Sequence, residues 1–359
     1  MTALLLIAGL VLLLVGAEAL VRGASRLAAA TGLSQLVIGL TVVAFGTSAP
    51  ELAVGLDAAW RGSVDVAIGN VVGSNITNVL LILGLSALVA PLVVSRQLVR
   101  LDVPVMIACS LAVLALAWNG RIGRVEGIVL ALAAVAYVIL QIRASRRAGE
   151  DAPVPAPDAG ATAVRGPRGW IGNGLLVLGG LALLVLGARW MVGAAVTVAE
   201  ALGLSELVIG LTVIAVGTSL PEIATSLLAT LRGQRDLAVG NVVGSNILNL
   251  LAVLGLTAAF APDGLPVGRA TVHFDLPVMI ATAVACLPIF FTGHCIRRWE
   301  GALFLGYYVV YVAYLLLQAT QHDALPAFSG TMLYFVLPLT AVTLAVTLSR
   351  SLRHRFRAR

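Results

Sequence analysis

The chain has 359 residues, of which 60% are hydrophobic and only 11% are charged. Soluble domains carry about a quarter charged residues, so this composition excludes an ordinary soluble protein and predicts a polytopic helical membrane protein. All 23 basic residues are arginine, and the three cysteines are scattered without metal-ligand spacing. We therefore expect the cysteines to be packing residues.

Eleven apolar runs are long enough to cross a membrane. Turn residues and charges separate them, and in chain order they cover residues 2–21, 34–60, 65–90, 101–118, 123–142, 170–197, 205–231, 237–261, 273–292, 299–318 and 327–349. The interval at residues 143–169 is rich in Pro, Ala and Gly. Such a segment has little to bury, so we expect a flexible linker there.

The arginines fall unevenly on the two sides of the predicted membrane. Loop parity places 18 of them on one side and 5 on the other. Because basic loops remain in the cytoplasm, we expect the N-terminus outside and the linker and C-terminus inside. The net charge of +6 is then explained by topology, and no nucleic-acid partner is expected.

An internal repeat dominates the sequence. Residues 39–85 and 210–256 are identical at 30 of 47 positions, at a constant offset of 171 and without a gap. The similarity continues outward, where LDVPVMIA at 101–108 matches FDLPVMIA at 274–281. Each copy contains five predicted spans, and an odd number means that the second copy crosses the membrane in the opposite direction.

This inverted repeat is typical of secondary transporters. It predicts an all-α membrane protein with five helices in each repeat. The predicted division is a first repeat at 1–142, a cytoplasmic linker at 143–169, a second repeat at 170–318, and an additional span with a basic cytoplasmic tail at 319–359.

Each repeat carries a carboxylate in the middle of an apolar span. Glu51 lies in GTSAPE and Glu222 in GTSLPE, and the inversion brings both toward the membrane midplane. A charge at that depth costs roughly 3 kcal/mol or more, so the two groups must be protonated or share cations. The proline directly before each glutamate predicts a broken helix that frees backbone carbonyls around Ala44 and Ala215.

Two further segments, GNVVGSNITN at 69–78 and GNVVGSNILN at 240–249, supply more oxygens. Their hydroxyl and amide groups belong to Ser74, Asn75, Asn78, Ser245, Asn246 and Asn249. With no His or Cys nearby, the set suits hard cations such as Ca²⁺ or Na⁺ rather than Zn²⁺ or copper. Two carboxylates match the charge of one Ca²⁺, two Na⁺ or two protons.

The paired motifs G-T-S-x-P-E and G-N-x-x-G-S-N-x-x-N resemble those of the cation/calcium exchanger superfamily, in particular its bacterial and archaeal sodium/calcium exchangers. The resemblance covers the first ten spans. It implies alternating access by sliding of the first and sixth spans, and a location in a prokaryotic cytoplasmic membrane. It also implies a cation site of Glu51 and Glu222 for both ions, Thr47 and Thr218 for Ca²⁺, Ser48, Ser74, Ser219, Ser245 and the carbonyls of Ala44 and Ala215 for Na⁺, and Asn78 and Asn249.

Exchange of Ca²⁺ for Na⁺ is therefore the leading hypothesis, with both ions as substrates in a lipid membrane. Neither a cofactor nor an enzymatic activity is expected, and no protein partner can be inferred from the sequence. A Ca²⁺/H⁺ antiporter remains open because the same carboxylates can titrate, and so does a passive cation channel or a non-transporting membrane receptor. Some relatives carry Asp at the position of Asn249, which implies a lower negative charge here. Asp57, whose repeat counterpart is Leu228, is a weaker candidate, for which a role in lining an entrance stays open.

Overall fold

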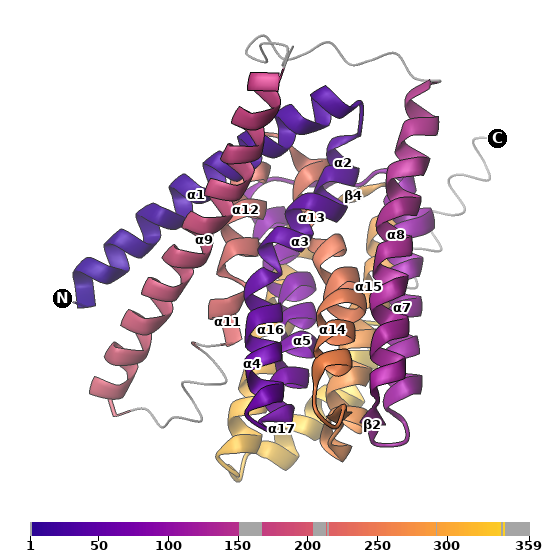
Figure 1. Cartoon of the computed structure of the whole chain (residues 1–359). Helices are drawn as coiled ribbons and strands as arrows, with labels where there is room; N and C mark the ends of the chain where they lie inside the picture. Colours follow the sequence, from indigo (N-terminus) through magenta and orange to yellow (C-terminus); the bar gives the residue numbers. More distant parts are fainter. Residues whose placement is uncertain are drawn as a thin grey trace.

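The computed structural model describes residues 2–150, 167–203, 213, 215–291, 293–338 and 340–341. Helices make up nearly all of this part of the chain, and two short strand pairs complete it (Figure 1). Eight described helices are long and apolar enough to cross a membrane, or nine if a bent pair is counted as one span. The predicted class, a polytopic helical membrane protein, is confirmed.

The first repeat begins with one long helix, α1, followed by spans that are divided into shorter pieces. In these pieces the η elements are π-helical segments, which have a wider turn than the α-helix. The elements are α1 (Thr2–Thr31), α2 (Gln35–Ile38), η1 (Gly39–Val43), α3 (Ala44–Thr47), α4 (Ala49–Trp60), α5 (Val64–Thr77), η2 (Asn78–Leu83), α6 (Gly84–Val89), η3 (Leu98–Asp102), α7 (Val103–Ala117) and α8 (Arg124–Glu150).

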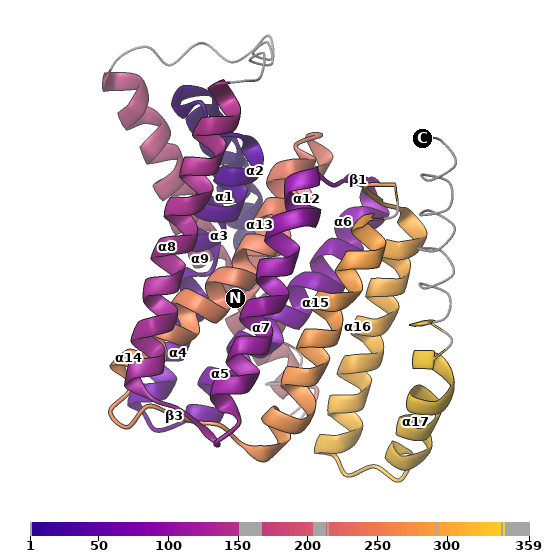
Figure 2. The same cartoon turned by 90° about the vertical axis from the view of Figure 1, so that its right-hand side faces the viewer.

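The second repeat has the same division wherever the structure describes it. Its elements are α9 (Pro167–Ala201), α11 (Ala215–Thr218), α12 (Leu220–Leu231), α13 (Arg235–Leu248), η5 (Asn249–Val253), α14 (Leu254–Phe260), η6 (Thr271–Asp275), α15 (Leu276–Phe291) and α16 (Arg298–Ala319). Beyond the repeat lie α17 (Leu325–Thr331) and η7 (Met332–Val336), beside α16 in Figure 2.

Several helices are longer than their apolar runs predict. Helix α1 continues ten residues beyond the predicted end at 21, and α8 and α9 extend into the predicted linker from both sides. The residues added to α8 include Ala and Arg, which are strong helix formers. The described residues do not include the middle of the predicted linker, 151–166. They also leave out the end of the predicted eleventh span, at 342–349, and the tail at 350–359.

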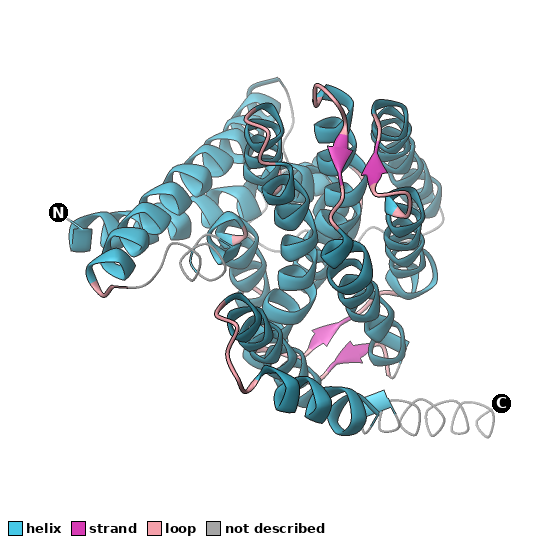
Figure 3. Ribbon diagram, turned by 90° about the horizontal axis from the view of Figure 1, so that it is seen from below, coloured by secondary structure: helices cyan, strands magenta, loops and turns pink. Residues whose placement is uncertain are grey.

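Contacts between the two repeats occur twice: a contact of one segment with the other repeat is matched by a contact of the equivalent segment with the first repeat. A twofold relation between the repeats requires this. Strand β1 (Leu92–Val93) pairs with β4 (Cys295–Ile296), and β2 (Arg121–Ile122) pairs with β3 (Leu265–Pro266). Since β3 is the repeat equivalent of β1 and β4 that of β2, one pair is the copy of the other. The pairs lie at opposite ends of the bundle (Figures 1 and 2), and Figure 3 shows them as two separate ribbons. This arrangement fits repeats of opposite direction.

Glycines show the same relation between α1 and α9, which pack against each other. A Cβ added to Gly9 would lie 2.8 Å from the carbonyl oxygen of Gly187, and one added to Gly16 would lie 2.8 Å from that of Gly180. Gly180 and Gly187 are the copies of Gly9 and Gly16 at the offset of 171. Small residues at such crossings let membrane helices approach closely, so this pair depends on glycine.

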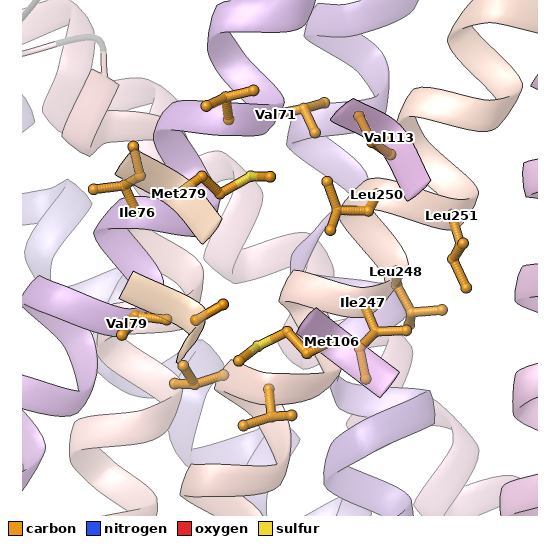
Figure 4. Close-up of a cluster of buried hydrophobic side chains, with 14 of the residues drawn as sticks. Val71, Ile76, Val79, Met106, Val113, Ile247, Leu248, Leu250, Leu251 and Met279 are labelled. Carbon is orange, nitrogen blue, oxygen red and sulfur yellow. The ribbon is translucent and has the colours of Figure 1, made fainter. Parts of the chain in front are cut away.

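The core lies between the third and eighth spans. In the apolar windows of Asp65–Val89 and Arg235–Phe260, 78% and 89% of the residues are buried, whereas the other long spans bury at most 39%. Figure 4 shows part of this core, in which Val71 and Ile76 belong to one buried cluster with Ile247 and Leu250 of the other repeat. The two GNVVGSN segments therefore occupy the centre of the molecule.

A test of the α1–α9 contact uses two adjacent glycines of α9. Gly180→Ala should lower the thermal unfolding temperature by several degrees, because overpacking costs about 1–3 kcal/mol. Its Cβ would lie 2.7 Å from the amide nitrogen of Leu20. Gly179→Ala is the matched control, since a Cβ there meets no atom within 4 Å. Equal melting temperatures for the two variants in detergent would contradict the packing argument.

Candidate functional site

The helix breaks predicted from the prolines are present in both repeats. Helix α3 ends at Thr47, and α4 begins again at Ala49 with a bend of 41°. In the second repeat, α11 ends at Thr218 and α12 begins at Leu220. Each glutamate thus lies in the first turn of a new helix, where the helix dipole favours a negative charge.

The break does not leave the carbonyl of Ala44 free. This oxygen accepts a hydrogen bond from the amide of Ser48 at 3.0 Å, and the Thr47 hydroxyl lies 3.4 Å away. The expectation of a freed carbonyl there is wrong, because the residue before the proline-containing turn still reaches back to it. In the second repeat the corresponding amide, that of Ser219, donates instead to Val216 at 3.2 Å.

Glu51 and Glu222 are brought together as predicted. Their side chains are 0% and 1% exposed, and the two carboxyl groups are close enough to interact electrostatically. Ser74 donates to Oε1 of Glu51 at 3.3 Å, and Ser219 donates to the hydroxyl of Ser74 at 3.5 Å. Among the described residues, Oε2 of Glu51 and both oxygens of Glu222 have no hydrogen-bond partner. Two like charges buried with so few donors require protons or cations.

The threonines of the two breaks contact the opposite repeat. The Thr47 hydroxyl donates to Oδ1 of Asn241 at 3.2 Å, and the Thr218 hydroxyl donates to Oδ1 of Asn70 at 3.4 Å. Asn70 also donates to the backbone oxygen of Glu51 at 3.1 Å. Asn70 and Asn241 are not among the predicted site residues. The signal for them was present, since each is the first asparagine of its GNVVGSN segment.

The remaining predicted residues contribute oxygens that lack a donor. Asn78 and Asn249 are buried at the starts of η2 and η5, the kind of wide turn that is frequent at functional sites. Their amide nitrogens donate to Asn246 and Asn75, but their Oδ1 atoms accept no hydrogen bond within the described structure. The same holds for the hydroxyls of Ser48 and Ser245.

Buried polar atoms normally have partners, and each exception requires an explanation. Here seven such oxygens come from predicted site residues: Oε2 of Glu51, Oε1 and Oε2 of Glu222, Oγ of Ser48 and Ser245, and Oδ1 of Asn78 and Asn249. No cluster of three or more His, Cys, Asp and Glu side chains occurs in the described ranges. Two carboxylates with neutral hydroxyl and amide oxygens form a donor set that fits hard cations.

The class of protein follows from three features of the structure. They are the matched contacts between inverted repeats, the two broken helices and the pair of buried intramembrane carboxylates. These features are typical of secondary transporters, whose substrate sites lie where the repeats meet. The comparisons with known proteins identify the family within this class.

The chain belongs to the sodium/calcium exchanger protein family, whose model matches residues 1–143 and 173–317. It is 37% identical over 330 residues to the inner membrane protein YrbG of Escherichia coli, covering 87% of this chain and 95% of YrbG. It is 34% identical over 343 residues to the sodium/calcium exchanger MaX1 of Methanosarcina acetivorans, covering 87% and 97%. The matched ranges end before α17.

A solved structure agrees with the sequence relatives. The chain matches the sodium-calcium exchanger NCX_Mj, soaked with zero Na⁺ and Ca²⁺, with a TM-score of 0.74 and 30% identity. The match covers 88% of this chain and 98% of NCX_Mj. The predicted resemblance to sodium/calcium exchangers is therefore confirmed.

Asp102 is a buried carboxylate outside this site. It lies at the end of η3 and accepts hydrogen bonds from two side chains of α8, Tyr137 at 3.2 Å and Gln141. Gln141 in turn accepts from Gln97 at 2.9 Å. This cluster ties the fourth predicted span to the fifth, so its role is to hold helices together.

The structural role of Asp102 can be tested with two variants. Asp102→Leu should lower the thermal unfolding temperature, because it leaves two buried donors without an acceptor at about 1–3 kcal/mol each. Asp102→Asn keeps an acceptor oxygen of the same shape and should restore most of the loss. Cation exchange per folded molecule should stay unchanged in both. A stable Asp102→Leu protein that has lost exchange would assign this residue to transport instead.

Proposed function

We propose that this protein is an antiporter that exchanges Ca²⁺ for Na⁺ across a membrane by alternating access. The observation that carries the proposal is the set of buried oxygens without donors around Glu51 and Glu222. Transport needs a site that holds an ion in place of its hydration shell, and these oxygens are of the required kind. The printed names of MaX1 and NCX_Mj support the same pair of ions.

Charge balance explains why one site serves both ions. Two carboxylates neutralise one Ca²⁺ or two Na⁺, so either load leaves the buried site with the same total charge. An empty site keeps two repelling carboxylates in a low dielectric, which disfavours reorientation without cargo. Obligatory exchange follows from this penalty, because only the loaded forms cross at low cost.

The proposed ligands divide between the two ions. Glu51 and Glu222 bind both, and the backbone oxygens of Thr47 and Thr218 contribute to the Ca²⁺ site, as the resemblance to the family implies. The proposed Na⁺ ligands are Ser48, Ser74, Ser219, Ser245 and the carbonyl of Ala215, with Asn78 and Asn249 completing the ring. The carbonyl of Ala44 is left out because it already accepts the Ser48 amide. A third carboxylate is missing from this ring since position 249 is an amide, which limits the positive charge that each cycle can carry.

The coupling ion is tested by radioactive calcium uptake into proteoliposomes that contain Na⁺, K⁺ or choline. Uptake only with internal Na⁺ is the expected result. Uptake driven by an imposed pH difference without Na⁺ would favour the alternative Ca²⁺/H⁺ antiporter. Uptake that needs no counter-ion gradient would favour a passive channel, and no uptake at all would leave a receptor.

The glutamates provide the sharpest mutational test. Glu51→Gln and Glu222→Gln keep the side-chain volume but leave a divalent cation with one carboxylate. Because lost charge compensation in a low dielectric is worth several kcal/mol, each variant should lose exchange by roughly two orders of magnitude or more. The double variant should be little worse than either single variant, since they share one site.

Asp57→Asn is the matched control for these variants. Asp57 lies on α4 like Glu51, but it is exposed and pairs with Arg61 at 2.9 Å. It should keep most of the exchange rate. Near-normal Na⁺-dependent Ca²⁺ uptake by either glutamate variant would contradict the shared-site mechanism.

The proposed orientation has the N-terminus outside and the C-terminal tail in the cytoplasm of a prokaryotic inner membrane. A reporter that is active only after export should therefore stay silent when fused after Arg359. The same reporter fused after Gly120, which follows the fourth predicted span, should be active. The reverse pattern would invert the assignment made from the arginines.

A further inference from the structure

Four asparagines meet at the centre of the molecule, and they are of two kinds. Asn75 and Asn246, on α5 and α13, are each 2% exposed and are hydrogen-bonded through both ends of the amide. Asn78 and Asn249 use only their amide nitrogens, while their Oδ1 atoms remain without a donor. The first pair, called the saturated pair below, is thus engaged at both ends of its amides, and the second pair offers oxygens.

The saturated pair fixes how the other pair points. Nδ2 of Asn78 donates to Oδ1 of Asn246 at 3.0 Å, and Nδ2 of Asn249 donates to Oδ1 of Asn75 at 3.3 Å. An asparagine amide has a donor end and an acceptor end, so a hydrogen bond that holds the nitrogen turns the oxygen the other way. Asn246 and Asn75 therefore turn the oxygens of Asn78 and Asn249 away from themselves.

Two methionines in turn orient the saturated pair. Nδ2 of Asn246 donates to Sδ of Met106 at 3.4 Å, and Nδ2 of Asn75 donates to Sδ of Met279 at 3.6 Å and to the backbone oxygen of Asn246 at 3.3 Å. If the Asn246 amide were rotated by half a turn, its NH₂ group would face the NH₂ group of Asn78. Its oxygen would then face the sulfur of Met106, which cannot donate a hydrogen bond. The thioether is a weak acceptor, but it selects one of the two orientations.

The methionines come from outside the site helices. Met106 lies on α7 and Met279 on α15, in the copies LDVPVMIA and FDLPVMIA, and they are 1% and 2% exposed. Figure 4 shows both side chains within the buried cluster. The two chains of contacts, Met106 to Asn246 to Asn78 and Met279 to Asn75 to Asn249, exchange under the repeat relation.

We infer that Met106 and Met279 are positioning residues. Through Asn246 and Asn75, they make Asn78 and Asn249 present their Oδ1 atoms rather than their NH₂ groups to the transported cation. The inference rests on the proposed function, in which Asn78 and Asn249 are ligands. Groups behind a metal ligand commonly set its orientation and thereby the affinity. With the methionines absent, the NH₂ group of a ligand asparagine would face the cation part of the time and repel it.

The test compares leucine and glutamine at the same position. Met106→Leu conserves volume but removes the acceptor, so the apparent Ca²⁺ affinity should fall roughly tenfold, within the range for loss of such supporting groups. Met106→Gln supplies a side-chain oxygen that can accept from Asn246, and it should restore most of the affinity. Met279→Leu and Met279→Gln should behave alike. Met191→Leu, in the apolar contact of α9, is the control and should change nothing.

A double variant separates positioning from general packing. Met106→Leu should have almost no further effect on Ca²⁺ affinity in an Asn78→Ala background, because the ligand that it positions is already gone. Affinity is measured on purified protein by calcium-induced thermal stabilisation, and exchange in proteoliposomes. An equal loss in both backgrounds, or a glutamine variant no better than leucine, would overturn the inference.

The two proposals fail in different ways. If the unmodified protein shows neither calcium-induced stabilisation nor exchange, the proposed function is wrong. If the unmodified protein binds and exchanges Ca²⁺ and Glu51→Gln does not, while the methionine variants match the control, only the positioning inference is wrong. Melting temperatures without calcium, unchanged among the variants, show that each one is folded.

Discussion

The burial of two negatively charged carboxylates close to each other is the constraint on which this structure depends. Glu51 and Glu222 have almost no contact with solvent and few hydrogen-bond donors, so their charges are stable only with cations or protons between them. Each lies in the first turn of a helix after a break, where the helix dipole partly compensates its negative charge. The oxygens around them come from both repeats, which ties the chemistry of the site to the inverted fold.

The fold meets this constraint because each repeat bonds to the other through equivalent residues. Thr47 bonds to Asn241 of the other repeat as Thr218 bonds to Asn70, and Asn78 bonds to Asn246 as Asn249 bonds to Asn75. Glycine contacts at the α1–α9 crossing and the two strand pairs follow the same rule. Neither repeat can therefore complete the site alone.

Much of this could be read from the sequence because the repeat is nearly identical where the site lies. The break at each proline and the meeting of Glu51 with Glu222 follow from local chemistry and inversion. The occupied carbonyl of Ala44 could not be predicted, since it depends on where one amide hydrogen bonds after the break. The partners of Asn75 and Asn246 also could not be predicted, because Met106 and Met279 are distant in sequence and read as ordinary apolar residues.

The repeats differ at the ends of the helices, and this difference has a consequence for transport. Glu18 of α1 pairs with Arg22 and with Arg232, which directly follows the helix that carries Glu222. Its repeat equivalent is Arg189, which has the opposite charge and cannot form the same pair with Arg61, the equivalent of Arg232. Two conformations related by the repeat axis would have equal free energy only if the repeats were identical. In the proposed exchange cycle the unequal ion pairs would remove that equality, so the inward-facing and outward-facing forms would differ in stability even though the proposed ligand oxygens are nearly symmetric.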